Sequence, residues 1–254
     1  MKLSYDFRKN ARDALRGRWS IAVIAGIVAA LLGGMNSYGI DFSFDPSFIF
    51  ELGSKPAPEY GEVGTQTSDG VALILLGVLG AVLSVSLVFG IAMFILGSII
   101  NVGYSAFNLD LADRRNAELS TLFSYFKNWK VCVLANLLQT VYILLWSLLL
   151  IIPGIIATYS YAMTPYILAE NPNLSPKEAL DRSKQMMIGN KWRLFCLDIS
   201  FIGWTLLCIL TLGIGTLWLN PYINVARADF YREISGTRVH SGYYDPMGDF
   251  NYTV

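Results

Sequence analysis

Three aspartates that lie inside or beside apolar runs are the residues best suited to chemistry: Asp198, Asp110 and Asp113. A carboxylate at the centre of a membrane span costs about 2.5–3.5 kcal/mol on insertion scales, so it usually has a partner or a task. Asp198 follows Lys191 and Arg193 closely along the chain, which favours an ion pair with one of them or solvation near the membrane interface. The alternative is that Asp198 binds a proton or a cation during transport.

Asp110 and Asp113 are spaced i, i+3 and are followed directly by Arg114 and Arg115. Clustered carboxylates of this kind hold the metal ions of phosphotransferases, so the pair is the candidate for a phospholipid-active enzyme. Two adjacent arginines instead favour a salt-bridged end of a helix. We therefore expect a structural role for both aspartates.

The sequence contains no recognisable catalytic set. His240 is the only histidine and lies in a polar tail, and no nucleotide-binding, serine-nucleophile or zinc-peptidase motif occurs. The three cysteines, which all fall in apolar runs, are interpreted as small hydrophobic residues: Cys132, Cys196 and Cys208. We expect no catalytic residues, no metal site, no cofactor and no enzymatic activity.

The composition indicates the compartment. Of the 254 residues, 54% are hydrophobic and only 15% charged, and the mean hydropathy is +0.47. Ordinary soluble domains are about 45–50% apolar and about 25% charged. These values exclude a disordered or nucleic-acid-coating protein and argue strongly against a soluble enzyme.

Four apolar runs are long enough to cross a membrane, which takes about 20 residues of helix. Two of them, 71–109 and 131–169, each contain 39 residues without a single charge, and 194–226 contains only Asp198. Basic residues are retained on the cytoplasmic side. Only the 36–70 segment is poor in them, with Lys55 against six acidic residues, so it is placed outside.

This charge distribution predicts an all-α, polytopic membrane protein with six transmembrane helices arranged as three hairpins and with short cytoplasmic interfacial helices. The predicted spans lie at about 19–38, 71–100, 131–152, 154–169, 194–211 and 213–231 within a single domain, 1–234. An acidic outer loop occupies 39–70, and a flexible cytoplasmic tail occupies 235–254. The last two spans are short enough that a re-entrant pair is the alternative.

Proline and glycine mark the expected breaks. Pro153 and Gly154 lie near the middle of the third apolar run, where a hairpin turn is required, and Gly213 and Gly215 are expected to do the same in the fourth. Pro165 and Pro221 begin matching Pro-Tyr-Ile triplets near the exits of two hairpins, which is consistent with a tandem repeat.

Three polar or amphipathic helices are expected before the hairpins, at 4–17, 120–129 and 176–188. The first places Phe7, Ala11, Ala14 and Leu15 on one side, and the last has Ser175 as its N-cap. Such helices either lie on the inner membrane surface, attracted by anionic lipids, or close the cytoplasmic face of the bundle. The second interpretation is the plainer one.

The chain also resembles a family of bacterial integral membrane proteins, domain of unknown function 975. The similar residues are Ile151–Tyr161, Pro172, the helix after Ser175, Ser183, Met187, Gly189, Phe201–Trp204, Leu212–Gly215, Pro221–Tyr222, Phe230–Tyr231 and the opening Arg12–Trp19. The family is distantly similar to the membrane domain that precedes some glycerophosphodiester phosphodiesterases. The resemblance implies a multi-pass bundle, but it supplies no activity and no site residues.

These observations predict a multi-pass protein of a bacterial cell membrane with both termini in the cytoplasm. Its expected role is that of a non-enzymatic scaffold or accessory protein for lipid-like molecules or partner proteins. A secondary transporter that uses Asp198 is the alternative, and a phospholipid-active enzyme is the third possibility. The expected partners are the bilayer itself, anionic lipids at the cytoplasmic face and a membrane protein, but no nucleic acid.

Overall fold

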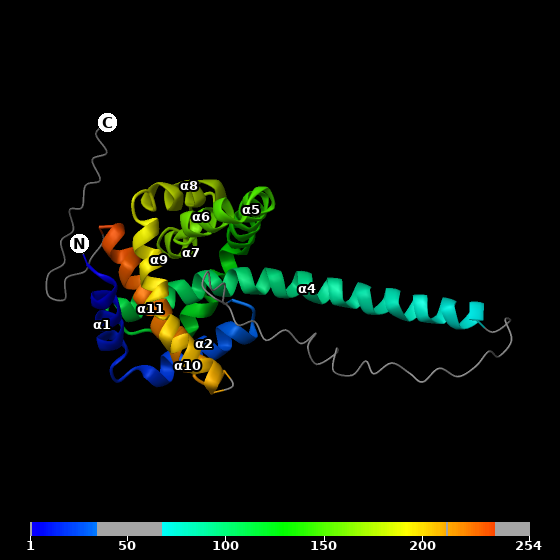
Figure 1. Ribbon diagram of the computed structural model, residues 1–254, viewed down its shortest axis with the longest axis horizontal. Helices are drawn as coiled ribbons and strands as arrows, with labels where there is room; N and C mark the ends of the chain where they lie inside the picture. Colours follow the sequence, from blue (N-terminus) through cyan, green and yellow to red (C-terminus); the bar gives the residue numbers. More distant parts are fainter. Residues whose placement is uncertain (1, 35–67, 212, 237–254) are drawn as a thin grey trace. The chain divides into compact units, whose positions relative to one another are not determined.

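The computed structural model describes residues 2–34, 68–211 and 213–236. All regular structure in these ranges is helical (Figure 1). The helices are α1 (Ser4–Leu15), α2 (Trp19–Leu31), α4 (Ser68–Ala112), the 3₁₀ helix η1 (Leu119–Asn128), α5 (Trp129–Leu149), α6 (Ile151–Tyr161), α7 (Thr164–Glu170), α8 (Pro176–Met186), α9 (Lys191–Ile199), α10 (Ile202–Leu210) and α11 (Thr216–Ile234). The all-α fold class is therefore confirmed. The predicted acidic loop and the tail lie almost entirely outside the described residues.

The chain divides into two compact units, Met1–Tyr38 with Met93–Val254, and Gly39–Ala92. The predicted second span, 71–100, is part of the longer helix α4, which continues to Ala112. The last part of α4 belongs to the first unit, where Ile100, Phe107 and Leu111 are buried. The rest of this description concerns that first unit.

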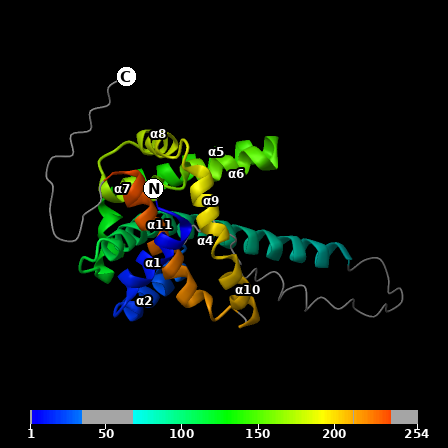
Figure 2. The same ribbon diagram turned by 60° about the vertical axis from the view of Figure 1, so that its left-hand side comes forward.

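The N-terminal segment forms two helices bent by 103° at a short break that contains Gly17. All four residues predicted for one side of α1 (Phe7, Ala11, Ala14 and Leu15) are buried. They face protein, because α1 packs along α11 (Figure 2). The apolar side of α1 is therefore covered by protein in this unit. The helix α2 ends at Leu31, earlier than predicted.

Helices α5 and α6 form an antiparallel hairpin, but the predicted position of its turn is wrong. The chain reverses at Leu150, whose backbone is extended, and Pro153 is already the third residue of α6. Proline is tolerated there because the first N–H groups of a helix have no intrahelical partner. Gly154 instead permits the close approach of the two arms, since a Cβ atom at this position would overlap Ser147.

The fourth apolar run contains a break and a turn. Helices α9 and α10 are separated at Ser200 and Phe201, and the chain then turns before α11, with Gly213 at a φ of +86°. Gly215 lies so close to Cys208 that a Cβ atom there would force a shift. The two glycines thus occupy a turn, as expected. Pro221 lies inside α11 rather than at a helix boundary.

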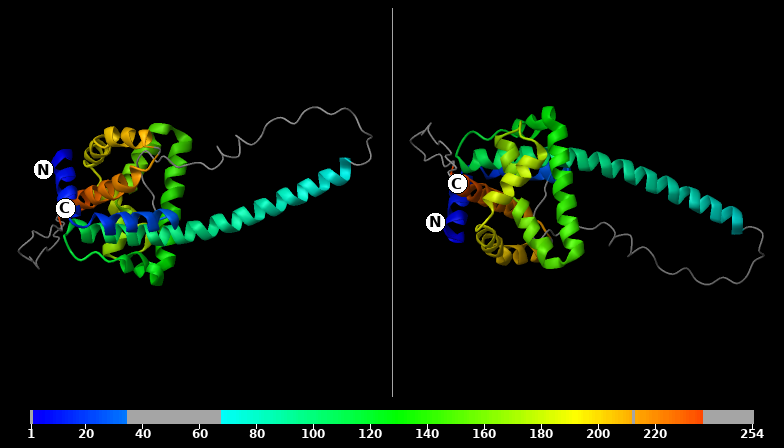
Figure 3. Two further views of the ribbon diagram at one scale, coloured as in Figure 1. Left: turned by 90° about the horizontal axis from the view of Figure 1, so that it is seen from below. Right: turned by 90° about the horizontal axis from the view of Figure 1, so that it is seen from above.

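Three helical stretches of the described residues are long and apolar enough to cross a membrane: Gly80–Ala112, Leu119–Leu149 and Lys191–Leu210. The bent pair α1 and α2 makes a fourth if it is counted as one span. The helices of the first unit are not all parallel, as Figure 3 shows from below and from above. The structure therefore supports a membrane protein with three or four candidate spans.

Candidate functional site: buried ion pairs along α11

The final turns of α11 carry four charged residues: Arg227, Asp229, Arg232 and Glu233. Each meets an oppositely charged side chain from another part of the chain. Both arginines are buried, with 7% of each residue exposed. An isolated charge at such depth is very costly, so each pairing is a strong constraint on the fold.

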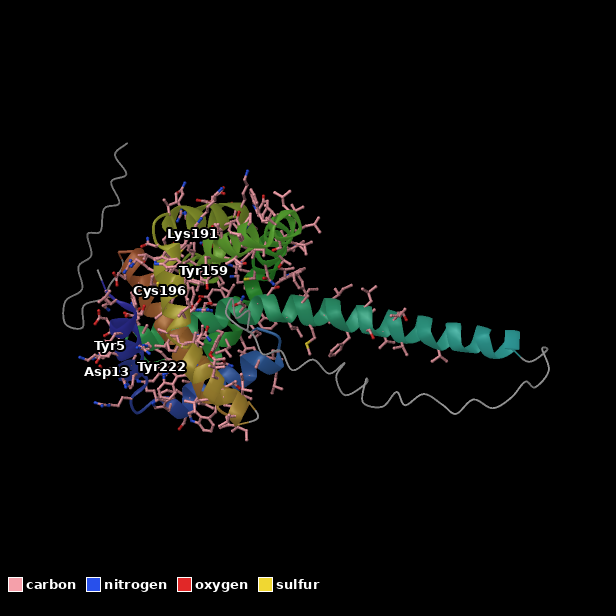
Figure 4. The ribbon with its side chains drawn as sticks, viewed as in Figure 1. Tyr5, Asp13, Tyr159, Lys191, Cys196 and Tyr222 are labelled. Carbon is pink, nitrogen blue, oxygen red and sulfur yellow. The ribbon has the colours of Figure 1, made fainter. Side chains whose placement is uncertain are left out.

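Asp198 pairs with Arg227, which lies in α11, and with neither of the predicted basic residues. Its Oδ1 atom accepts hydrogen bonds from Arg227 Nε at 3.1 Å and Nη2 at 2.9 Å. The hydroxyl of Tyr159, labelled beside α9 in Figure 4, donates to Oδ2 at 3.2 Å. The expected ion pair is therefore present, but its partner lies in a helix 29 residues further along the chain. Arg193, the predicted partner, binds Glu233 instead.

Arg232 is held between two carboxylates. Its Nε and Nη2 atoms donate to Asp113 at 2.9 and 2.6 Å, and its Nη1 atom donates to Glu170 at the end of α7. The hydroxyl of Tyr231 donates to the second oxygen of Glu170 at 2.5 Å. Burial opposes the charge on Arg232, but Glu170 and Asp113 outweigh it and raise its pKa above the usual value of an arginine. The guanidinium thus joins three helix ends as a permanent cation.

A third group of charges joins the start of the chain to α11. The Lys2 ammonium lies 3.0 Å from the Asp229 carboxylate, and Asn10 donates to the same carboxylate at 2.9 Å. Arg193 lies 2.7 Å from Glu233 and also donates to the Lys2 carbonyl at 3.2 Å. The N-terminal segment is therefore fastened to both α9 and α11.

The remaining predicted site residues belong to ion pairs or to local features of the backbone. Asp110 lies 4.0 Å from Arg115, which also approaches Asp113 at 3.7 Å, so the predicted salt-bridged helix end is present. The positions of the other four candidate residues show only local roles: Pro153 and Gly154 in the hairpin, Pro165 at the start of α7 and Pro221 in α11. Within the described residues, no group of three potential ligands is arranged to hold a metal ion.

Four residues of this arrangement were not predicted from the sequence: Arg227, Arg232, Glu170 and Tyr159. One signal was present: Arg227 and Arg232 follow an apolar run directly and alternate with acidic residues. Alternating charges at the end of a helix usually indicate a solvated face. Only the positions of other helices show that this face is buried.

The family of this region follows from a comparison with protein-family models. The model described as protein of unknown function (DUF975) matches residues 147–238. This segment is similar to DUF975. It takes in α6 to α11 and therefore all the charged residues of α11, and it confirms the resemblance inferred from the sequence over this part of the chain. The similar opening motif, Arg12–Trp19, lies outside the DUF975 segment. No curated protein and no solved structure matches the chain.

Proposed function

We propose that this protein is a multi-pass scaffold of a bacterial cell membrane that holds lipid-like molecules or partner proteins and does no chemistry itself. The proposal includes six membrane segments in three hairpins, with both termini in the cytoplasm. Its basis is a helical chain with three or four candidate spans and a DUF975 segment, whose family has no known activity.

One observation carries the proposal: segments assigned to the cytoplasm by their basic residues meet around the end of α11. Lys2 contacts Asp229, and Arg232 contacts Asp113. Further along, Tyr125 of η1 donates to the Ala169 carbonyl at 2.6 Å. Polar groups on opposite sides of a hydrocarbon layer about 30 Å thick could not make such contacts. The contacts therefore support a common side for these segments.

The ion pairs also favour a scaffold over the alternative secondary transporter. A coupling carboxylate must gain and release a proton or a cation during each cycle. The Asp198 carboxylate pairs with two nitrogens of the Arg227 guanidinium and accepts a hydrogen bond from the Tyr159 hydroxyl. Such an arrangement suits a fixed connection between α6, α9 and α11 better than a carboxylate that gains and loses a proton or a cation in each transport cycle.

Anionic lipid is the partner we propose for η1. This helix buries Leu122 but leaves Phe123, Phe126 and the adjoining Trp129 exposed by 47%, 40% and 44%. The Lys130 ammonium lies 5.8 Å from the centre of the Trp129 ring. Aromatic rings and lysines together suit the headgroup layer of a membrane. In α1, by contrast, the apolar side is buried in protein.

Cysteine labelling tests the topology. In a variant without native cysteines, a membrane-impermeant maleimide should label Glu59→Cys in intact cells. It should label Gln185→Cys, an exposed position of α8, only after the membrane is opened. The reverse pattern would contradict the topology.

The scaffold role is tested by removing the charges of one ion pair together. The double variant Asp198→Asn/Arg227→Gln keeps a neutral hydrogen-bonding pair in place of the ions. A scaffold should still restore the phenotype of a deletion strain when this variant reaches normal abundance in the membrane. Normal abundance without restored function would contradict the scaffold and favour the transporter.

A further inference from the structure

Three arginines from two distant parts of the chain meet where α2 begins and α4 ends. Arg18 donates through Nη2 to the Arg114 carbonyl at 3.3 Å and through Nη1 to the Arg115 carbonyl. Arg114 and Arg115 follow closely after the last residue of α4, and both are exposed. We call these three residues the arginine cluster. Like charges repel one another, so such a group favours an anion between or beside its members.

The acidic residues nearby do not cancel this positive charge. Asp113 is already bound by Arg232 at 2.6 Å and approaches Arg115 only at 3.7 Å. Asp110 lies 4.0 Å from Arg115, whose side chain is 54% exposed. The other two members of the arginine cluster form no ion pair within the ranges that the structure describes. The cluster therefore keeps a surplus of positive charge.

The backbone of Arg114 is unusual. Its φ is +58°, and among the described residues it is the only one besides glycines with a positive φ. A left-handed residue after the end of a helix is usually glycine, because a Cβ atom makes this conformation strained. Strained residues gather at functional sites, where the strain is compensated by what the side chain does. The arginine at this position thus indicates a use for its side chain.

The arginine cluster lies at one end of two apolar helices that pack side by side. At their other end, a Cβ atom on Gly97 of α4 would overlap the carbonyl of Gly33, which follows α2. The helix α2 therefore runs antiparallel along the last part of α4. Residues Trp19–Leu31 contain no charge, and the candidate span Gly80–Ala112 ends just before the cluster. Basic residues at the ends of apolar helices lie at the level of the lipid headgroups.

We propose that the arginine cluster binds the phosphate group of an anionic membrane lipid. Guanidinium groups offer charged N–H donors that match phosphate oxygens. A lipid fits better than a free phosphate, because one side of α2 beside the cluster is apolar and exposed, at Ile24, Ile27 and Leu31. Acyl chains can cover this side. The site rests on the proposed membrane role and adds to it a ligand with named binding residues.

The test measures how tightly phosphatidylglycerol, labelled on an acyl chain, binds to the purified protein in a neutral detergent. Arg114→Gln removes one charge and should weaken the affinity about fivefold, and Arg114→Gln/Arg115→Gln should weaken it about 25-fold. Arg114→Lys keeps the charge and should keep most of the affinity. Unchanged affinity in the glutamine variants, or an equal loss with lysine, overturns the proposal.

Arg182→Gln is the matched control, because it removes the same charge from α8, where the Arg182 side chain is 49% exposed. This variant should bind the lipid like the unchanged protein. A loss equal to that of Arg114→Gln would show that the lipid responds only to the net charge of the protein, which would rule out the arginine cluster as a site.

Two further ligands separate the possible failures. If the unchanged protein binds labelled phosphatidylcholine, which has no net charge, as tightly as phosphatidylglycerol, anionic lipid fails as a partner both here and at η1. If it prefers phosphatidylglycerol and Arg114→Gln retains the whole preference, only the arginine cluster fails. Glycerol 3-phosphate in excess should not displace the lipid. Displacement would make the cluster a site for a free phosphate and would overturn the lipid assignment.

Discussion

Replacing Arg232 with glutamine is the most direct test of the ion pairs along α11. The variant Arg232→Gln leaves Asp113, with 4% of its side chain exposed, and Glu170, with 23% exposed, without their shared cation. Removing one partner of a buried ion pair costs about 3–5 kcal/mol, since the remaining charge stays buried. At about 2–4 °C per kcal/mol for a chain of this size, the melting temperature should fall by about 6–20 °C.

The chain offers a matched control at its surface. Arg182 and Glu178 of α8 form an ion pair at 3.0 Å, and both side chains are 49% exposed. Arg182→Gln should cost at most about 0.5 kcal/mol, because exposed pairs at i, i+4 contribute little. Both variants are measured by thermal unfolding of the purified protein in nanodiscs. Equal losses for the two variants would refute the inferred role of burial.

A rescue separates lost charge from lost packing. Asp113→Asn and Glu170→Gln, added to Arg232→Gln, remove the two carboxylates that the first change left unpaired. The triple variant should recover at least half of the lost stability, because neutral amides cost far less to bury than ions. No recovery would mean that the arginine acts through its shape.

Two further substitutions test local features of the fold. Gly103→Ala should lower the free energy of unfolding by about 1–3 kcal/mol, because the new Cβ atom would overlap the Leu122 carbonyl. Gly80→Ala is the control and should be neutral or slightly stabilising, because no atom lies within 4 Å of its Cβ position. Equal melting temperatures for the two variants would contradict the close approach of Gly103 to Leu122. Ser175→Ala should lower the free energy of unfolding by about 1 kcal/mol, because the Ser175 hydroxyl accepts a hydrogen bond from the Glu178 N–H at 3.3 Å. The rate of amide hydrogen exchange at the start of α8 should rise in this variant. An unchanged exchange rate would show that the cap contributes nothing to stability.

Local patterns predicted the helices well. The buried side of α1 follows from the 3.6-residue period alone, and all four of its predicted residues are buried. In α8, Ser175 caps the helix, as expected, and Gly189, two residues past the C-cap Met187, has a φ of +77°. These features depend on residues within two turns of one another, so the sequence contains all the information they need.

Features that depend on distant parts of the chain were predicted less well. Proximity along the chain indicated Lys191 or Arg193 as the partner of Asp198, but α9 turns Arg193 towards Glu233 and Asp198 towards Arg227. The hairpin turn was placed at Pro153 because proline breaks a helix interior, whereas the first turn of a new helix accepts it. In both cases the deciding contact comes from another helix.

The arrangement of charges on α11 explains how a charge-poor chain specifies its packing. Asp229 and Glu233, four residues apart, share one side of the helix and meet Lys2 and Arg193. Arg232, three residues after Asp229, meets Asp113 and Glu170 instead. A rotation of α11 that brought Glu233 towards Glu170 would set two carboxylates against each other and leave Arg232 unpaired. Apolar side chains fit several rotations at small cost, so the four paired charges of α11, two of them on buried arginines, single out the observed rotation.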